Sequence, residues 1–422
     1  MIQTRELRPA LVAPPRVDVD RLDVLDVVFL LGALIAPMTL QIFGALTVYD
    51  VLIAGLFFLI AAGPRRMVPL PAGYVVPALV FLGFALLSTV RATLPLQALT
   101  QTVQFAFVFF VQLPVVMTIA RTRRLIRWSL VLFIVGSFGV VVVSILTHRA
   151  TSADRVLVFN SDNPNPLGYP AAYILPFALC FILDLWHRGR RLASLLSTAA
   201  FVGLAIASLA ASASRGAAVA VLVALPIFLV FRGSTRINLG LIVRLLVTVA
   251  VVCAGAYAYF HTQYFPATLK DRIERTLADD SSLIQDRERL AVAGMREFTS
   301  SPFIGTGLDN FRYVSRRYNE AATPQAPHNL WIQLLAQVGL IGTIAFAIII
   351  VRWFATLLRA WRAGGERGRH ELLGAFLASF ASIMIIFMTT PIMIDRHYWL
   401  LFGLGLALVA LPAYARPGQE VA

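Results

Sequence analysis

Apolar stretches of about the length that crosses a bilayer recur along almost the whole chain. A hydrocarbon core of about 30 Å needs about 20 residues of helix, and a helix satisfies its own backbone polar groups inside lipid. The sequence therefore predicts an all-α polytopic membrane protein with about twelve transmembrane helices. The twelve stretches are residues 25–44, 46–62, 73–90, 97–120, 125–147, 168–186, 193–211, 216–231, 240–260, 330–351, 372–390 and 397–412.

Composition and charge exclude other classes of protein. The chain is 59% hydrophobic and 14% charged, well short of the charge of a soluble domain. Its net charge of +14 would suggest a nucleic-acid partner in a soluble protein, but in a membrane protein basic residues gather in cytoplasmic loops. We therefore expect no nucleic-acid partner. Cys180 and Cys253 lie in apolar runs without metal-type spacing, which argues against a disulfide or a zinc site.

Arginine divides the connections between the spans into two alternating sets, and the richer set is expected to be cytoplasmic. This places both termini in the cytoplasm and the long segment 261–329 outside. The richer set holds seventeen arginines: Arg65, Arg66, Arg121, Arg123, Arg124, Arg127, Arg188, Arg190, Arg191, Arg232, Arg236, Arg244, Arg352, Arg359, Arg362, Arg367 and Arg369. The other short connections hold Arg91, Arg149, Arg155, Arg215 and Arg396.

The layout predicted from these spans has five parts. A polar arm, 1–24, precedes helices 1–9 in 25–260, and helices 10–12 occupy 330–412 before a short tail, 413–422. The outer segment 261–329 has balanced charge and two helical patterns, 266–279 and 284–299, with Leu290, Met295 and Phe298 on or near one face. We expect it to form a helical cap between helices 9 and 10.

An outer arginine near a span contradicts the charge rule and needs another explanation. Arg215 lies in A-S-A-S-R-G-A, between two spans, and Arg91 also lies on the outer side. A guanidinium there can hold a phosphate through two hydrogen bonds, with Ser214 supplying a polar backbone turn. The alternative is an arginine that extends to lipid headgroups. We favour the phosphate clamp.

Two further arginines alternate with acids in I-Q-D-R-E-R-L. Arg287 and Arg289 are candidates for binding an anion, although charge runs of this kind usually form a solvated helix face. The polar turn F-N-S-D-N-P-N-P also leaves two readings open. Asn163 and Asn165 can recognise a sugar, but ordinary turn chemistry is more common for such residues.

His328 and Asn329 open the apolar stretch P-H-N-L-W-I-Q-L-L-A. A histidine can act as a general base near neutral pH. It can equally be structural, and periodicity does not separate the two roles. No HExxH, CxxC, P-loop or tight acidic pair occurs in the outer segments, so we predict no metal and no cofactor.

Four of these motifs occur in a fixed order, and together they resemble the O-antigen ligase family. The resemblance covers roughly 160–345, with Ala291 as a departure where relatives carry Trp. The motifs are A-S-R-G-A at Arg215; R-x₁₄-P-x-x-G-x-G from Arg287 through Pro302, Gly305 and Gly307; N-F at Asn310 and Phe311; and H-N-L-W-x-x-L-L-A-x-x-G-x-x-G from His328, with N-P-N at 163–165 as a further likeness.

The resemblance implies a GT-C-like glycosyltransferase of the Gram-negative inner membrane, acting at its periplasmic face without a metal. Such enzymes move O-antigen from undecaprenyl diphosphate to a sugar hydroxyl of lipid A–core. The residues matching its motifs are then expected to act as follows: Arg215 and Arg287 as catalytic cations, His328 as general base, and Arg289, Asn329, Ser214, Asn163, Asn165 and Arg91 as substrate-binding residues. An O-antigen polymerase, a protein O-oligosaccharyltransferase and a lipid-linked glycan transporter remain as alternatives.

Overall fold

The described part of the chain is helical almost throughout, as expected for an all-α membrane protein. The computed structural model describes residues 22–43, 46–147, 156–158, 165–233, 281–314, 317–318, 327–390 and 395–411, with isolated positions between 240 and 274. The predicted span 240–260, the arm 1–24 and the tail 413–422 lie mostly or wholly outside these residues. The count of twelve spans therefore stays a prediction.

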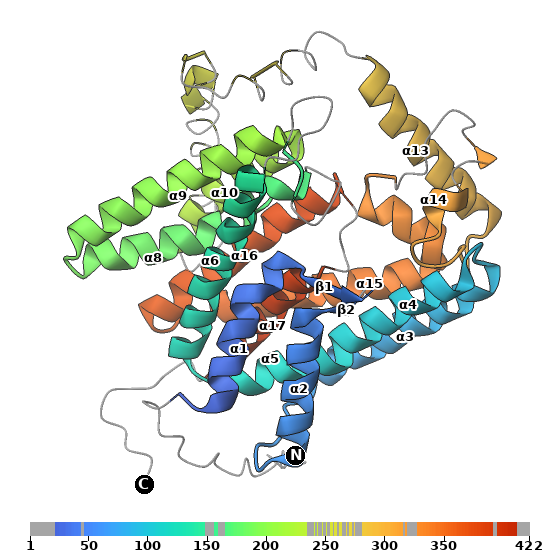
Figure 1. Cartoon of the computed structure of the whole chain (residues 1–422), viewed down its shortest axis with the longest axis horizontal. Helices are drawn as coiled ribbons and strands as arrows, with labels where there is room; N and C mark the ends of the chain where they lie inside the picture. The colour runs from blue at the N-terminus through green and yellow to red at the C-terminus, as the bar shows by residue number, and fades with distance from the viewer. Residues whose placement is uncertain are drawn as a thin grey trace, which may run out of the picture.

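Eight described helices or helix runs have the length and composition to cross a membrane (Figure 1). They comprise α3 (Ala72–Ser88); α4 (Pro95–Phe107) with α5 (Leu113–Ile119); α6 (Arg123–Thr147); α7 (Pro170–Tyr173) with α8 (Leu175–His187); α9 (Arg191–Ser212); α10 (Arg215–Gly233); α15 (Leu330–Arg362); and α16 (Arg367–Phe387). Three shorter apolar helices are α1 (Val24–Ile35), α2 (Val48–Ala62) and α17 (Arg396–Ala410), and two polar-side helices are α13 (Ser281–Ser300) and α14 (Phe311–Val314).

The first predicted span, 25–44, ends earlier than expected, whereas the second ends at Ala62 as predicted. Helix α1 gives way at Pro37 to a short turn, where Thr39 has a φ of 45°. A two-stranded hairpin follows, β1 (Gln41–Phe43) paired antiparallel with β2 (Leu46–Thr47). The prediction of helix through residue 44 was therefore wrong, because proline and a left-handed residue stop the helix before the apolar run ends.

Other helix boundaries also differ from the predicted spans. A π-helical turn at Val108–Gln112 joins α4 to α5, and Pro176 lies near the start of α8 after the short α7. Helix α15 runs to Arg362, beyond the predicted end at 351. Hydrophobicity reports where a span exists, but it does not report these local changes of helical winding.

Helices α10 and α16 pack closely along their lengths. Helix α10 presents the fully buried Ala217, Ala220 and Ala224 at helical spacing, followed by Phe228. Small residues at such spacing let two membrane helices approach each other closely. Near the other end of α10, the indole of Trp361, on α15, donates to the Phe231 carbonyl at 2.9 Å. The packing brings the start of α10 to the end of α16.

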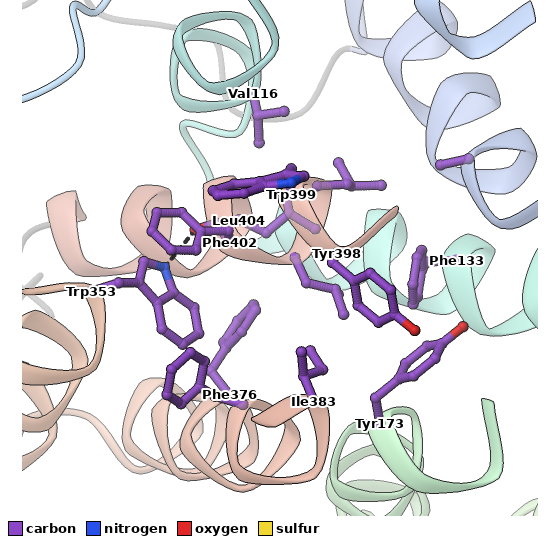
Figure 2. Close-up of a cluster of buried hydrophobic side chains, with 14 of the residues drawn as sticks. Val116, Phe133, Tyr173, Trp353, Phe376, Ile383, Tyr398, Trp399, Phe402 and Leu404 are labelled. Carbon is purple, nitrogen blue, oxygen red and sulfur yellow. Dashed lines mark hydrogen bonds between the residues drawn. The ribbon is translucent and has the colours of Figure 1, made fainter. Parts of the chain in front are cut away.

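Aromatic side chains fill the core between α15, α16 and α17 (Figure 2). The indole of Trp353 donates to the Phe402 carbonyl at 2.9 Å and stacks on the Phe402 ring. Gly405 makes this contact possible, since a Cβ there would stand 2.9 Å from the Trp353 ring. This core fixes α15 against the helices that bear the candidate site.

Candidate functional site

The tight turn between α9 and α10 places Arg215 at a helix N-terminus. Ala213 has a φ of 45° and ends α9, and the Ser214 hydroxyl accepts from the Ala217 amide at 3.4 Å. Arg215 is then the first residue of α10. The unpaired amides of a helix N-terminus favour anions, so the side-chain cation and the helix end act in the same sense. Ser214 serves here as the helix cap.

Thr389, just beyond the end of α16, connects this turn to His328. Gly216 approaches it so closely that a Cβ would lie 2.7 Å from the threonine hydroxyl. The His328 ring makes a hydrogen bond with the Thr389 backbone. Arg215 and His328 are more than 100 residues apart in sequence, and one threonine joins their surroundings.

His328 occupies a strained position at the start of α15. Its φ is 50°, in the left-handed region that non-glycine residues seldom adopt. The next residue, Asn329, caps the helix, with its Oδ1 accepting from the amides of Trp331 at 2.9 Å and Ile332 at 3.3 Å. The predicted helix start is confirmed, and the Asn329 amide oxygen is engaged in it. The cap holds the imidazole where the chain turns into the apolar helix.

The electrostatics of His328 suit a base. Its ring is half-buried, and within the described residues its Nδ1 has no hydrogen-bond partner. Burial lowers the pKa of the ring below its ordinary value, and the positive charge of Arg287 lowers it further; the hydrogen bond with the Thr389 backbone opposes both. The lowered pKa favours the neutral imidazole at pH 7, which is the form that can accept a proton.

Helix α13 packs on the first turns of α15 and so positions Arg287 near His328. Its buried face includes Leu290 and Ala293, and a Cβ on Gly294 would stand 2.5 Å from Ile332. The expectation that Met295 belongs near this face was wrong, because Met295 is 42% exposed. The sequence pattern placed long apolar side chains on the face of α13 that contacts α15. The close contact between the two helices instead requires small residues there, such as Ala293 and Gly294.

Arg287 and Arg289 are both exposed on α13. Only the charge of Arg287 contributes to the lowered pKa of His328. Successive helical positions point about 100° apart, so these two arginines leave the helix in widely different directions. The structure thus associates Arg287, rather than Arg289, with the histidine.

The P-x-x-G-x-G motif forms a loop whose backbone hydrogen-bonds to α15 at a point where that helix is interrupted. At the break, Gly339 has a φ of 71°, and the helix ladder is interrupted. The loop 302–307 replaces the missing bonds: Thr306 N donates to Ala336 O at 3.1 Å, Gly307 N to Gln337 O at 2.9 Å, and Leu340 N to Pro302 O at 2.7 Å. The glycines here therefore support the site without touching the reacting groups.

A second anchor ties the same segment to the turn between α3 and α4. Asn310 is fully buried; its Oδ1 accepts from the Leu94 amide at 2.7 Å, and its Nδ2 donates to the Leu94 carbonyl at 3.3 Å. Arg91 donates to the Ser301 hydroxyl at 2.9 Å. We call α13, the loop 301–310 and α14 the cap; Figure 1 shows it at one end of the α3–α4 hairpin. In this structure Arg91 tethers the cap.

Asn165 borders the α9–α10 turn through its neighbours. A Cβ on Gly168 would lie 2.5 Å from the Ser212 hydroxyl, and Ser208 Oγ donates to the Leu167 carbonyl. The segment that begins at Asn165 is thus pressed against the residues that position Arg215. Asn163 lies outside the described residues.

Two features of the site had no signal in the sequence. Thr389 looks like an ordinary helix-end residue, and its role depends on three helices meeting. Asn310 was recognised only as part of a motif, and its buried hydrogen bonds depend on a loop 216 residues away. Within the residues described, the structure brings together no group of three or more His, Cys, Asp or Glu side chains suited to a metal.

Comparison with known proteins gives one family match. Residues 199–347 match the family model described as O-Antigen ligase. This range contains the α9–α10 turn, the cap and the broken start of α15, which are the elements that surround His328. A comparison with curated proteins finds no match.

Proposed function

We propose that this chain, a member of the O-antigen ligase family through residues 199–347, is an O-antigen ligase of the Gram-negative inner membrane. It would transfer the glycan from undecaprenyl diphosphate to a sugar hydroxyl of lipid A–core, at the periplasmic face. One observation supports this most: a half-buried His328, whose lowered pKa favours the neutral ring, lies within the field of Arg287 and shares Thr389 with the Arg215 turn.

In the proposed reaction, His328 accepts the proton of the acceptor hydroxyl as that oxygen attacks the anomeric carbon. A new C–O glycosidic bond forms while the C–O bond to the diphosphate breaks, and the bonding electrons leave with the diphosphate. A base in this role accelerates proton transfer by about 10²–10⁴-fold. In-line attack would invert the anomeric centre.

The leaving diphosphate gains negative charge, and fixed cations aimed at that charge stabilise the transition state. Arg215 at the N-terminus of α10 and Arg287 on α13 are our candidates. Arg289 and Asn165 are secondary candidates for substrate contacts. Arg91, Asn329 and Ser214, which the sequence also suggested, now have structural partners, so their proposed contacts with substrate are indirect.

Lipid substrates must reach this site from within the bilayer. An apolar cavity of about 830 Å³ lies between α2 and α4, bounded at one side by the buried ion pair of Asp50 and Arg396. A second, of about 560 Å³, lies between α6, α8 and α9. Openings of this kind are what a polyprenyl or acyl chain needs for lateral entry.

The decisive experiment supplies purified protein with lipid-linked glycan and either lipid A–core or a peptide acceptor. We expect transfer to lipid A–core; transfer only to peptide would identify a protein O-oligosaccharyltransferase, and elongation of the donor itself a polymerase. Activity should persist in EDTA, because arginines carry the charge in this mechanism. A loss that added metal restores would contradict that account.

The remaining alternative is a transporter that only holds the diphosphate. It would need cations but no base. His328→Ala separates the two functions, since a transporter would keep its full activity while a ligase would bind its donor and fail to transfer. Wild-type transfer by this variant would remove His328 from the mechanism.

A further inference from the structure

A polar cavity of about 280 Å³ lies apart from the lipid-sized apolar ones. The turn after α1, helix α6, the start of α7 and the start of α17 surround it. Its volume is small for a binding pocket, and suits one sugar ring rather than a longer glycan. The lining residues used below are Gln41, Ser137, Tyr169, Tyr173, Asp395 and His397.

His397 lines this cavity with an unsatisfied nitrogen. The residue is 7% exposed, and its Nδ1 has no hydrogen-bond partner among the described residues. A buried polar group that is left without a partner destabilises the folded state. Its ring is held by contacts with Phe133, Tyr173 and Tyr398, so it cannot easily turn toward another partner. His397 therefore adds to the cavity wall an imidazole whose hydrogen-bonding capacity is not filled by the described residues.

Asp395 adds a carboxyl to the same wall. It precedes α17, yet its side chain does not cap that helix. Burial raises the pKa of this carboxyl to about 7, with the neighbouring Arg396 guanidinium opposing the shift. Arg396 itself is paired with Asp50, so it does not neutralise Asp395 as an ion pair. Among the described residues this carboxyl is neither a helix cap nor a salt-bridge partner, which leaves it available to a ligand.

Aromatic rings complete the lining. Tyr173 and Tyr398 pack edge to face, and Figure 2 shows their hydroxyls on the same side of the cluster, near Phe133. Flat faces with polar tips, next to a carboxyl and an imidazole, suit a ligand with both C–H faces and hydroxyl groups. Val158 and Pro166, which also line the cavity, flank in sequence the polar stretch for which sugar recognition remained open.

The cavity is coupled to the proposed active site through one hydrogen bond. The hydroxyls of Tyr169, on the cavity wall, and Thr390 are bonded to each other. Thr390 follows Thr389, whose backbone bonds His328 and whose hydroxyl faces Gly216. A ring in the cavity would therefore lie beside Tyr169 and Thr390, next in sequence to the Thr389 that contacts both His328 and the Arg215 turn.

We propose that this cavity is a sugar subsite, in which Asp395 and His397 bind hydroxyl groups of one ring of a glycolipid substrate. The inference rests on the proposed function for the identity of the glycolipids, which are the lipid A–core acceptor and the lipid-linked glycan donor. Both residues are positioning residues and take no part in bond formation.

The test measures binding of four lipids to wild-type protein and to two variants, Asp395→Asn and His397→Phe. Asp395→Asn keeps the shape of the side chain and replaces one carboxyl oxygen with an amide nitrogen. His397→Phe replaces the imidazole with a flat ring that has no hydrogen-bonding nitrogen. The probes are lipid A–core, lipid A without core sugars, undecaprenyl diphosphate-linked glycan and sugar-free undecaprenyl diphosphate. Asp184→Asn is the control, because Asp184 is a carboxylate far from the cavity, paired with Arg127 and Arg188.

We expect both cavity variants to bind one sugar-bearing lipid about tenfold more weakly, the loss of about one hydrogen bond. Loss for lipid A–core would assign the acceptor sugar, and loss for the lipid-linked glycan the donor sugar. The sugar-free lipids and Asp184→Asn should show wild-type affinity. Unchanged affinity for both sugar-bearing lipids in Asp395→Asn would overturn the proposal.

Transfer by the wild-type protein is measured in parallel, so the two proposals can fail separately. A protein that transfers no glycan but loses sugar-lipid affinity in the cavity variants would refute the ligase and keep the subsite. The reverse pattern would keep the ligase and refute the subsite. If His397→Phe does not elute as folded protein, Asp395→Asn decides alone, because Asp395 supports no helix cap.

Discussion

The docked loop 302–307 and the residues at His328 both border α15, but they differ in backbone strain and in how completely their polar groups are hydrogen-bonded. In the loop, backbone amides and carbonyls pair with the broken helix, and glycine occupies the left-handed positions Gly305, Gly307 and Gly339. At the start of α15, which we call the lip, His328 takes the left-handed conformation, and its Nδ1 has no partner in the part of the chain that the structure describes. Glycine adopts that conformation without cost, whereas another residue bears strain of about 1–3 kcal/mol.

This contrast separates support from chemistry within one set of family motifs. The loop has the pattern of a structural joint, in which every replacement disturbs packing. The lip has the pattern of a reactive group, strained and incompletely bonded, which persists because its surroundings hold it. Changes in the loop should therefore lower stability, and changes at the lip should lower the rate.

The largest expected effect is on the rate, for His328→Ala. We expect kcat to fall by about 10²–10⁴-fold, because the acceptor proton loses its base. Thermal unfolding should change little, since alanine keeps the Cβ and hence the left-handed strain, and gives up only the hydrogen bond of the ring with the Thr389 backbone. Transfer assays and melting curves on the same preparation measure both. His187→Ala, on an exposed histidine at the end of α8, is the control.

Gly305→Ala should give the largest loss of stability. A Cβ there would lie 2.4 Å from the Gln337 carbonyl, and φ is 77°. We expect a loss of at least about 1–3 kcal/mol from backbone strain, increased by the clash. Gly203→Ala in α9, with nothing within 4 Å, is the matched control and should be neutral or stabilising. Equal melting temperatures for the two variants would contradict the docked loop.

Asn310→Ala tests the second anchor and should cost about 1–3 kcal/mol, because it leaves the Leu94 amide and carbonyl without their partner. The α3–α4 turn and the cap should loosen together, which hydrogen exchange at residues 92–98 and 301–314 would detect. The kcat of the protein that remains folded should change far less than in His328→Ala. A rate loss as large as that of His328→Ala, without a loss of stability, would place Asn310 in the chemistry.

Eight of the predicted spans coincide with described helices that are long and apolar enough to cross a membrane, because hydrophobic length is a property of each segment alone. The stretches predicted at 25–44, 46–62 and 397–412 correspond to shorter apolar helices. The sequence also placed the turn at Arg215 and the helix start at Asn329, since capping depends on adjacent residues. It did not predict the break at Gly339 or the hairpin after Pro37. Gly339 entered only as a position of the family motif, and the structure shows that a loop backbone occupies the space beside it.

The candidate site was predicted in its residue types but not in its connections. Arg287 could not be distinguished from Arg289 by sequence, because both alternate with acids on one helix. Thr389 and Asp395 carry no motif, and their importance comes from contacts between segments far apart in the chain. Long-range contacts of this kind, rather than local propensity, decided which polar residues face one another.

The smallest expected effect is a shift in pH dependence, and it tests whether the lip is electrostatically coupled to the cap. His328 acts as a base only when neutral, so activity should fall as the pH drops through its pKa. Burial and the positive charge of Arg287 lower that pKa, so the acid limb should lie below the ordinary value of about 6.5. In Arg287→Gln the cation is absent, the pKa rises, and the acid limb should move to higher pH.

The matched comparison is Arg289→Gln, because the charge of Arg289 does not contribute to the pKa of His328. Its normalised profile of kcat against pH should coincide with that of the wild type, whatever its absolute rate. Normalising each profile to its plateau separates the shift from the loss of phosphate binding that either substitution can cause. An acid limb that moves equally in both variants would show that the cap acts through its overall charge, and Arg287 would lose its special place beside the base.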